Sequence, residues 1–235
     1  MTMHLLPILK YHHVGDRREP FGLRRLWIST ERFEEQMAFL ASHGYRTLTL
    51  SECIPYFAAQ NPIPKRSVVL TFDDGFTNFR EYAFPVLQRY GFSASVFVVT
   101  GEVGGKSRWD CGWEFPLMGW DEICHLNQMG VDIGSHTVSH PHLTQLPQTE
   151  ALDELSRSRD VLETKLNRPV NTLLYPYGDT NSSVEALAEK AGYLPEVAAE
   201  TGGGGGNSRF RAEPQGHETR RIRCHHHRPA QTGCD

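Results

Sequence analysis

The stretch from Val68 to Gly75, which reads VVLTFDDG, constrains the fold of this chain more than any other. It begins with a β-branched apolar run typical of a parallel strand covered on both faces, and it ends in turn-forming residues. In α/β folds the carboxyl ends of parallel strands carry the chemistry. A plain strand followed by an Asx turn would show the same residues, so this stretch alone leaves both interpretations open.

The two carboxylates at the end of this stretch are adjacent in the sequence. Side chains that follow one another on an extended backbone point in opposite directions, so Asp73 and Asp74 can serve different tasks. One of them can bind a metal ion while the other accepts a proton from water.

Apolar runs that end in polar turns recur along the chain and alternate with helical patterns. We expect further strands at Leu5–Tyr11, Tyr45–Leu50, Ala94–Val99, Val131–Gly134 and Thr172–Tyr175. Apolar positions at helical spacing predict helices between them, including one capped by Ser29 or Thr30 and one over Asn78–Tyr90 that ends at Gly91. This order predicts an α/β fold, a distorted (β/α) barrel of about seven parallel strands.

The overall composition fits one globular domain and excludes several classes of partner. The chain has 235 residues, 39% of them hydrophobic, and a formal net charge of -4, which gives no reason to expect nucleic acid or an anionic membrane as partner. No apolar stretch is long enough to span a bilayer, and Met1–Leu9 lacks the basic start of a signal peptide. We therefore expect a cytoplasmic protein, or an extracytoplasmic one if the natural start lies upstream. No protein partner can be inferred.

Five cysteines are scattered widely and form no CxxC pair, so we expect reduced thiols and neither a disulfide framework nor a cysteine zinc site. They are Cys53, Cys111, Cys124, Cys224 and Cys234.

The character of the chain changes at five consecutive glycines, Gly202–Gly206, which precede a segment rich in Arg and His. We expect a catalytic domain over residues 1–200, followed by a Gly-rich linker and basic tail over residues 201–235. Within the tail, Arg220–Arg223 is the segment suited to a last edge strand. The tail is either native or the product of a truncated or altered end.

Three polar clusters follow predicted strands. They are Asp73 with Asp74, His136 with His140, and the turn Pro176–Gly178. Two imidazoles and one carboxylate form a facial ligand set suited to a divalent, zinc-like ion with open positions for water and substrate. Either histidine alone would more often be a surface or core residue, so the hypothesis rests on the joint pattern.

These residues resemble the polysaccharide deacetylases with the NodB homology domain, carbohydrate esterase family 4, and the resemblance covers about Pro7 to Ala199. TFDDG (Thr71–Gly75) is similar to the first motif, which implies that Asp73 is the catalytic base and Asp74 a metal ligand. SHTVSH (Ser135–His140) is similar to the second motif, which implies that His136 and His140 complete the metal site. The turn around Tyr177 resembles the third motif, whose tyrosine N–H helps to hold the oxyanion.

The chain also departs from the pattern of this family. Leu174 and Tyr175 stand where many members carry an arginine that orients the base, and the fourth and fifth motifs are not recognisable. ILKYHHV (Ile8–Val14) instead resembles the first strand of a rearranged branch related to poly-N-acetylglucosamine deacetylases. In that branch the general acid follows an aromatic residue, which implies His12 and not the tail histidines His225–His227.

The resulting prediction is a metal-dependent hydrolase that removes N-acetyl groups from an amino-sugar glycan, with zinc as the expected ion and cobalt or nickel as alternatives. The catalytic residues would be Asp73, His12 and Tyr177, and the metal ligands Asp74, His136 and His140. Two alternatives stay open: hydrolysis of a small non-sugar N-acyl amide, and a sugar-binding protein of the same fold that has lost turnover. The loop Gly101–Gly119, with Trp109 and Trp113, would decide the substrate, although its aromatic residues could equally pack beneath it.

Overall fold

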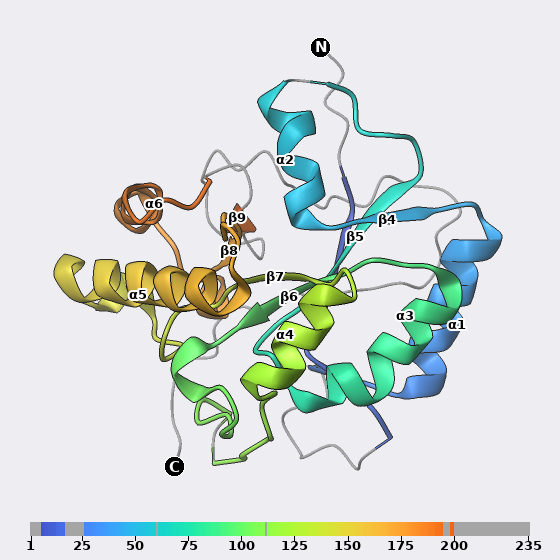
Figure 1. The fold of residues 1–235 in the computed structure, drawn as a ribbon, viewed down its shortest axis with the longest axis horizontal. Helices are drawn as coiled ribbons and strands as arrows, with labels where there is room; N and C mark the ends of the chain where they lie inside the picture. The colour runs from blue at the N-terminus through green and yellow to red at the C-terminus, as the bar shows by residue number, and fades with distance from the viewer. Residues whose placement is uncertain (1–5, 17–25, 60, 111, 195–197, 200–235) are drawn as a thin grey trace.

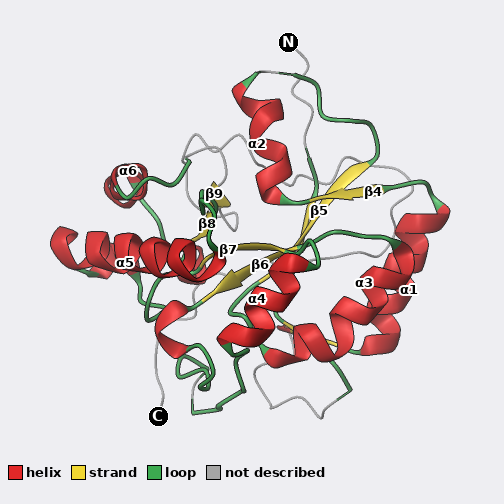
Figure 2. Cartoon of the chain, in the orientation of Figure 1, coloured by secondary structure: helices red, strands yellow, loops and turns green. Residues whose placement is uncertain are grey.

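One parallel sheet organises the chain. The structure, a computed structural model, describes residues 6–16, 26–59, 61–110, 112–194 and 198–199 (Figure 1). The main sheet has seven strands in the order β1-β5-β6-β7-β8-β9, and β4 also pairs with β5. Every pairing of this sheet is parallel. The predicted parallel α/β architecture is confirmed, and the sheet curls into a partial barrel (Figure 2).

The strands are short and the helices connect them. The strands are β1 (Ile8–Tyr11), β2 (His13–Val14), β3 (Trp27–Ile28), β4 (Arg46–Leu48), β5 (Ser67–Phe72), β6 (Ser95–Val98), β7 (Asp132–Ser135), β8 (Leu173–Leu174) and β9 (Ala198–Ala199). The α-helices are α1 (Thr30–Ser42), α2 (Leu50–Ala58), α3 (Phe84–Tyr90), α4 (Trp120–Gln128), α5 (Gln148–Leu166) and α6 (Ser182–Lys190).

The helices pack against one another around the sheet. α1 lies beside α3, α4 beside α5 and α5 beside α6 (Figure 1). Several of them begin and end where the sequence indicates. Ser29 caps α1, because its Oγ accepts a hydrogen bond from the Arg32 amide at 3.2 Å. Gly91 ends α3 in the left-handed conformation, with φ 65°.

The alternation of side chains along β5 separates two apolar clusters. Val68, Leu70 and Phe72 join the main cluster, which the buried faces of α1, α3, α4 and α5 complete. Val69 points the other way and joins a smaller cluster with Leu50 of α2 and residues of β6 and β8. We call the first face of the sheet the outer face and the second the inner face.

The same alternation decides what lies beyond Val69 on the inner face of the sheet. Thr71 and Asp73 follow Val69 at steps of two along β5 and the residue after it. On β1, Tyr11 joins the outer cluster, so Lys10 and His12 fall on the inner face. Four polar side chains therefore face the interior of the barrel at the carboxyl ends of β1 and β5.

Three local features differ from the sequence-based prediction. Helix α2 begins directly after β4 and contains Pro55, and the sequence pattern had indicated no helix there. The helix expected over Asn78–Tyr90 begins as a π-helix, η2 (Phe79–Ala83), and becomes α-helical only at α3, where Pro85 occupies its first turn. A small two-stranded parallel sheet joins β2 to β3.

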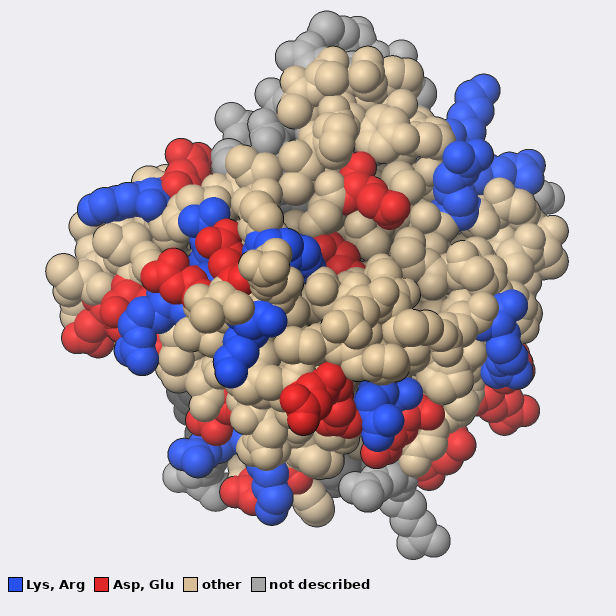
Figure 3. Space-filling model, in the orientation of Figure 1, with Lys and Arg blue, Asp and Glu red and all other residues tan. Residues whose placement is uncertain are grey.

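On the face drawn in Figure 3, basic and acidic side chains are interspersed, and no large region carries a single sign of charge. Among the described residues, no helix is both long enough and apolar enough to span a membrane. The tail with Arg220–Arg223 and His225–His227 lies outside the described residues.

Candidate active site

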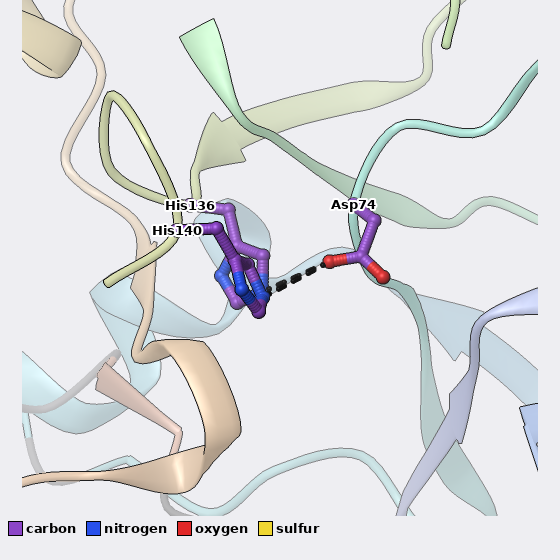
Figure 4. Close-up of side chains that lie close together, drawn as sticks. All are labelled: Asp74, His136 and His140. Carbon is purple, nitrogen blue, oxygen red and sulfur yellow. Dashed lines mark ion pairs between the residues drawn. The ribbon is translucent and has the colours of Figure 1, made fainter. Parts of the chain in front are cut away.

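Asp74, His136 and His140 converge at the carboxyl ends of β5 and β7. The Nε2 atoms of His136 and His140 lie 3.4 and 3.3 Å from Asp74 Oδ1. One ligand atom from each residue lies within 4.8 Å of the others, and all three side chains are buried. Both imidazoles point toward the carboxylate (Figure 4). The structure thus brings together the three residues that the sequence predicts as metal ligands.

The orientation of His136 is set by a contact to the neighbouring strand. Its Nδ1 lies 2.6 Å from the carbonyl oxygen of Leu174, so Nδ1 carries the proton and donates, and Nε2 is left as the possible ligand atom on the side of Asp74. The strand that delivers His136 needs glycine two residues earlier. A Cβ on Gly134 would lie 2.5 Å from the Phe97 ring and 2.6 Å from Thr172 Oγ1.

The loop that carries His140 is held from two sides. On one side, the amides of Thr100 and Gly101 donate to the carbonyls of Thr137 and Val138 at 3.1 and 2.8 Å. On the other side, Glu154 of α5 accepts hydrogen bonds from the loop. The donors are the Val138 amide at 2.8 Å, the Ser139 amide at 2.9 Å and the Ser139 hydroxyl at 2.7 Å.

Backbone strain concentrates at this site. Among the described residues, six non-glycine residues have φ in the left-handed region, and four of them lie in the predicted polar clusters or, for Thr137, between the two histidines of one cluster. These are Asp74 (φ 72°), Thr137 (φ 68°), His140 (φ 60°) and Tyr177 (φ 59°). Such conformations are costly for residues with a Cβ, and they persist where the surrounding contacts over-determine them.

Aromatic rings enclose His140. The Trp109 ring stacks on it with a centroid distance of 4.4 Å and an interplanar angle of 18°, and Tyr177 meets it edge-on at 4.6 Å. His142 stacks in turn on Tyr177 at 3.9 Å. Burial lowers the pKa of His140 below its ordinary value, against the opposing effect of Asp74, so the neutral ligand form is favoured.

The donor set fits a divalent cation. Asp74 Oδ1 is buried and has no hydrogen-bond partner of good geometry, and His140 Nδ1 is likewise without one. Burial alone would raise the pKa of Asp74, but the two adjacent imidazoles outweigh it and hold the pKa well below its usual range. A buried carboxylate oxygen without a hydrogen-bond partner, with one imidazole nitrogen at 3.4 Å and another at 3.3 Å, is suited to a zinc-like ion.

Asp73 lies apart from this ligand set and faces β1. Its side chain is 1% exposed, and its Oδ2 lies 2.8 Å from Lys10 Nζ and 3.5 Å from His12 Nε2. Its Oδ1 is buried and accepts no hydrogen bond. The two adjacent aspartates therefore have separate surroundings, as the sequence predicts, and among the described residues Asp73 pairs with Lys10 and His12 and not with His136 or His140.

The adjacent histidines His12 and His13 also have different surroundings. His12 is partly buried near Asp73, and desolvation lowers its pKa, with Asp73 opposing the shift. His13 instead packs among the rings of Trp27, Phe76 and Phe115, at centroid distances of 4.2, 3.8 and 4.6 Å. Burial there lowers the pKa of His13 to about 3, so it stays neutral.

Tyr177 lies on the 3₁₀ turn η5 (Pro176–Gly178), beside His140, and it is 49% exposed. The turn thus brings the third predicted cluster to the same place as the first two. Leu174 and Tyr175, where the resembling family carries an arginine, are both buried, and Leu174 packs in the inner apolar cluster. Neither position supplies a cation to Asp73.

The tryptophans of the sequence serve different purposes. Trp113 is 52% exposed, Trp109 packs on His140, and Trp120 is partly buried against the outer cluster, with Lys165 Nζ 5.5 Å from its ring centre.

Next to Trp109, burial raises the pKa of Asp110 to about 6, against the hydrogen bond that Ser107 Oγ donates to it at 2.6 Å.

The sequence analysis did not identify two residues of the site, Lys10 and Glu154. Lys10 stands two positions before His12, so strand alternation was a signal that both share one face. Glu154 belongs to a helix whose charged positions resemble an ordinary solvated face, and no sequence signal marks its contact with the Ser139 loop.

Comparison with known proteins identifies the family. Residues 60–195, more than half of the chain, match the polysaccharide deacetylase family. The Bacillus subtilis (strain 168) protein YxkH is 29% identical over 197 residues, which are 84% of this chain and 65% of that protein. A Staphylococcus aureus (strain MRSA252) poly-beta-1,6-N-acetyl-D-glucosamine N-deacetylase is 28% identical over 70% of this chain and 58% of its own length. The chain thus spans less than two thirds of these relatives.

Solved structures agree in fold. A Streptococcus pyogenes deacetylase, PplD in complex with acetate, superposes with a TM-score of 0.72 at 27% identity, covering 82% of each chain. IcaB from Ammonifex degensii gives a TM-score of 0.70 at 27% identity, covering 80% of this chain and 81% of that one. With the family match over residues 60–195, the parallel sheet and the three clusters at its strand ends, the chain belongs to the polysaccharide deacetylase family.

Proposed function

We propose that residues 1–200 form a metal-dependent hydrolase that removes N-acetyl groups from an amino-sugar polysaccharide or glycan. The observation that carries this proposal is the convergence of Asp74, His136 and His140 within 4.8 Å, beside a separate pair of Asp73 and His12. Amide hydrolysis needs a site that activates water and carbonyl and a site that moves protons, and these two groups can supply both.

Asp74, His136 and His140 would hold the metal, and their two nitrogens and one oxygen favour zinc, with cobalt or nickel as alternatives. When bound, a divalent ion polarises a carbonyl oxygen and lowers the pKa of water in its reach. The protein's own part is to fix these ligands, through Leu174 behind His136 and through Glu154 behind the loop of His140.

Asp73 is the proposed general base. Its buried Oδ1 accepts no hydrogen bond, so it can take one proton from water as the water oxygen adds to the acetyl carbon. His12 is the proposed general acid and protonates the amine nitrogen as the carbon–nitrogen bond breaks. Because burial lowers the pKa of His12, its protonated form gives up a proton readily, and the Asp73 carboxylate 3.5 Å away stabilises that form.

Tyr177 is the proposed oxyanion donor through its backbone N–H. Its left-handed backbone, with φ 59°, turns the chain sharply between Tyr175 and Gly178. Its ring lies 4.6 Å from that of His140, so the tyrosine borders the proposed metal site. Backbone donors fixed in this way stabilise negative charge on a carbonyl oxygen without reorganising during the reaction.

The proposed substrate is an acetylated amino-sugar polymer, in keeping with the name of the staphylococcal relative. The test is acetate release by the purified chain from N-acetylglucosamine oligomers, from O-acetylated sugars and from small non-sugar N-acyl amides. We expect release from the N-acetylated oligomers first. Release from the small amides alone would replace the proposed substrate class, and bound metal without release from any of them would favour a sugar-binding protein.

A further inference from the structure

Lys10 makes the shortest charged contact to the proposed base. Its Nζ lies 2.8 Å from Asp73 Oδ2, while His12 Nε2 lies 3.5 Å from the same oxygen. These are the ion pairs that Asp73 makes among the described residues. The motif resemblances described above assign no role to this lysine.

The contact is built into the pairing of two strands. β1 runs parallel to β5, with Lys10 opposite Thr71 and Tyr11 opposite Phe72. Asp73 follows this register directly, and its amide donates to the carbonyl of Tyr11 at 3.0 Å. The position of the lysine Cα relative to Asp73 is therefore fixed by backbone hydrogen bonds, and only the side chain itself can vary.

Because the Asp73 carboxylate is buried, its negative charge depends on the nearby positive charge of Lys10. The Asp73 side chain is 1% exposed and that of Lys10 is 27% exposed, so the lysine side chain stays partly in water while the carboxylate does not. A buried carboxylate that lacks donors is strongly destabilising, and Asp73 Oδ1 has none. The lysine stem can follow the inner face of the sheet while its charged end reaches the aspartate.

The contact with Lys10 also makes the two oxygens of the Asp73 carboxylate inequivalent. The closest charged contacts of Lys10 and His12 both fall on Oδ2, and neither oxygen has a hydrogen-bond partner of good geometry. A carboxylate held on one oxygen cannot rotate freely about its Cβ–Cγ bond, so the other oxygen keeps one direction. A base held in this way retains the geometry that proton abstraction from water requires.

We propose that Lys10 is the positioning residue of Asp73, which holds Oδ2 so that Oδ1 receives the proton of the attacking water. This inference rests on the proposed function. Lys10 acts through Asp73 and is not itself a donor to the reacting atoms. It also explains how the chain orients its base although Leu174 and Tyr175 supply no cation.

The test compares Lys10→Met, which removes the charge, with Lys10→Arg, which keeps a cation on a similar stem. The matched control is Arg89→Met, because Arg89 forms a similarly close pair with Glu34, at 2.9 Å, between two exposed helix positions. We expect Lys10→Met to lower kcat on the order of 10²-fold while KM and metal content stay near wild-type values. Lys10→Arg should recover most of the loss, and Arg89→Met should match the wild type.

A double-mutant cycle separates positioning from a merely structural role. In an Asp73→Asn background Lys10→Met should cause no further loss of the residual turnover, because the lysine acts through the carboxylate. An equal loss in both backgrounds, or a Lys10→Met enzyme as active as Arg89→Met, would overturn the inference.

Thermal unfolding provides a readout that needs no substrate. Lys10→Met should lower the unfolding temperature of the wild type, by leaving a buried charge unpaired, and should not lower that of Asp73→Asn. Equal lowering in both backgrounds would overturn the pairing itself. Coupling in unfolding together with no acetate release from wild-type protein would refute the proposed function and the catalytic role of Lys10, while the ion pair would stand.

Discussion

The Nδ1 atom of His136 lies 2.6 Å from the carbonyl oxygen of Leu174, and this one contact between β7 and β8 decides which imidazole nitrogen faces Asp74. Since Nδ1 donates to a carbonyl, Nε2 is left as the free lone pair, 3.4 Å from Asp74 Oδ1. The ligand set is therefore prepared by the strands before any ion binds. Preparation of this kind is what gives a metal site its affinity.

The first prediction concerns metal content. Asp74→Asn, His136→Ala and His140→Ala should each abolish the binding of about one divalent ion per chain, because a three-ligand site fails when one ligand is lost. Asp73→Asn is the matched control, since it changes the adjacent carboxylate, which faces Lys10 instead. It should keep the ion and lose turnover. Elemental analysis that finds the ion lost from Asp73→Asn and kept by Asp74→Asn would reverse the two roles.

The second prediction assigns the general acid. His12→Ala should reduce turnover on the order of 10²-fold with metal retained, because the proton donor to the leaving amine is removed. Replacing His225, His226 and His227 together by alanine should have little effect on turnover. Steady-state acetate release from the two proteins decides the matter: an inactive tail variant beside a normal His12→Ala would place the acid in the C-terminal segment.

The third prediction concerns the support of the His140 loop. Glu154→Ala removes the acceptor of three hydrogen bonds from Val138 and Ser139, and we expect it to weaken metal affinity ~10–100-fold. Asp153→Ala is the control on the same helix, because Asp153 pairs with Arg157 on an exposed surface. Metal titration of both variants measures the difference. Equal affinities would mean that the loop holds its shape without the glutamate.

The fourth prediction is a pH dependence of stability. The pKa of His13 is 6.5 in the unfolded chain and about 3 in the fold, where burial disfavours the charged form. The unfolded state therefore binds a proton that the folded state does not, and stability present above pH 6.5 is lost as the pH falls toward 3. The contribution is at most about 1.4 kcal/mol per pH unit.

His13→Gln lacks this titration, so in metal-free protein its unfolding free energy should fall less steeply with decreasing pH than that of the wild type. Denaturant unfolding between pH 7 and 5 compares the two slopes. Parallel slopes would show that His13 is not buried as a neutral ring among Trp27, Phe76 and Phe115.

Much of the fold could be predicted because buried parallel strands leave a strong signal. The apolar runs at β5 and β6 end in polar turns, and the shorter segment Val131–Gly134, although it contains Asp132, also leads into one, so the strands and their polar ends were visible. Helix α2 was missed although Leu50, Cys53 and Ile54 recur at helical spacing, because Leu50 was assigned to the strand expected over Tyr45–Leu50 and Pro55 interrupts the stretch. Its formation depends on covering Val69 and Phe97, which is a tertiary effect.

The residues of the proposed site could be identified from the sequence where they lie close together in it. Asp73 and Asp74 form a pair in one turn, and His136 and His140 share one loop. Lys10 and Asp73 are brought together by the register between β1 and β5, which a single sequence does not specify. Alternation along the chain separates His13 from His12, but the aromatic surroundings of His13 come from three distant segments, which the local sequence does not specify.

The most direct test of the account removes the metal and measures acetate. Wild-type protein is stripped with a chelator, and acetate release from N-acetylglucosamine oligomers is followed before and after one equivalent of zinc is added, with Asp74→Asn as the control. We predict no release from the stripped protein, recovery of release with zinc, and no recovery in Asp74→Asn. Full activity of the stripped wild type, or equal activity of Asp74→Asn, would contradict a metal-dependent deacetylase built on Asp74, His136 and His140.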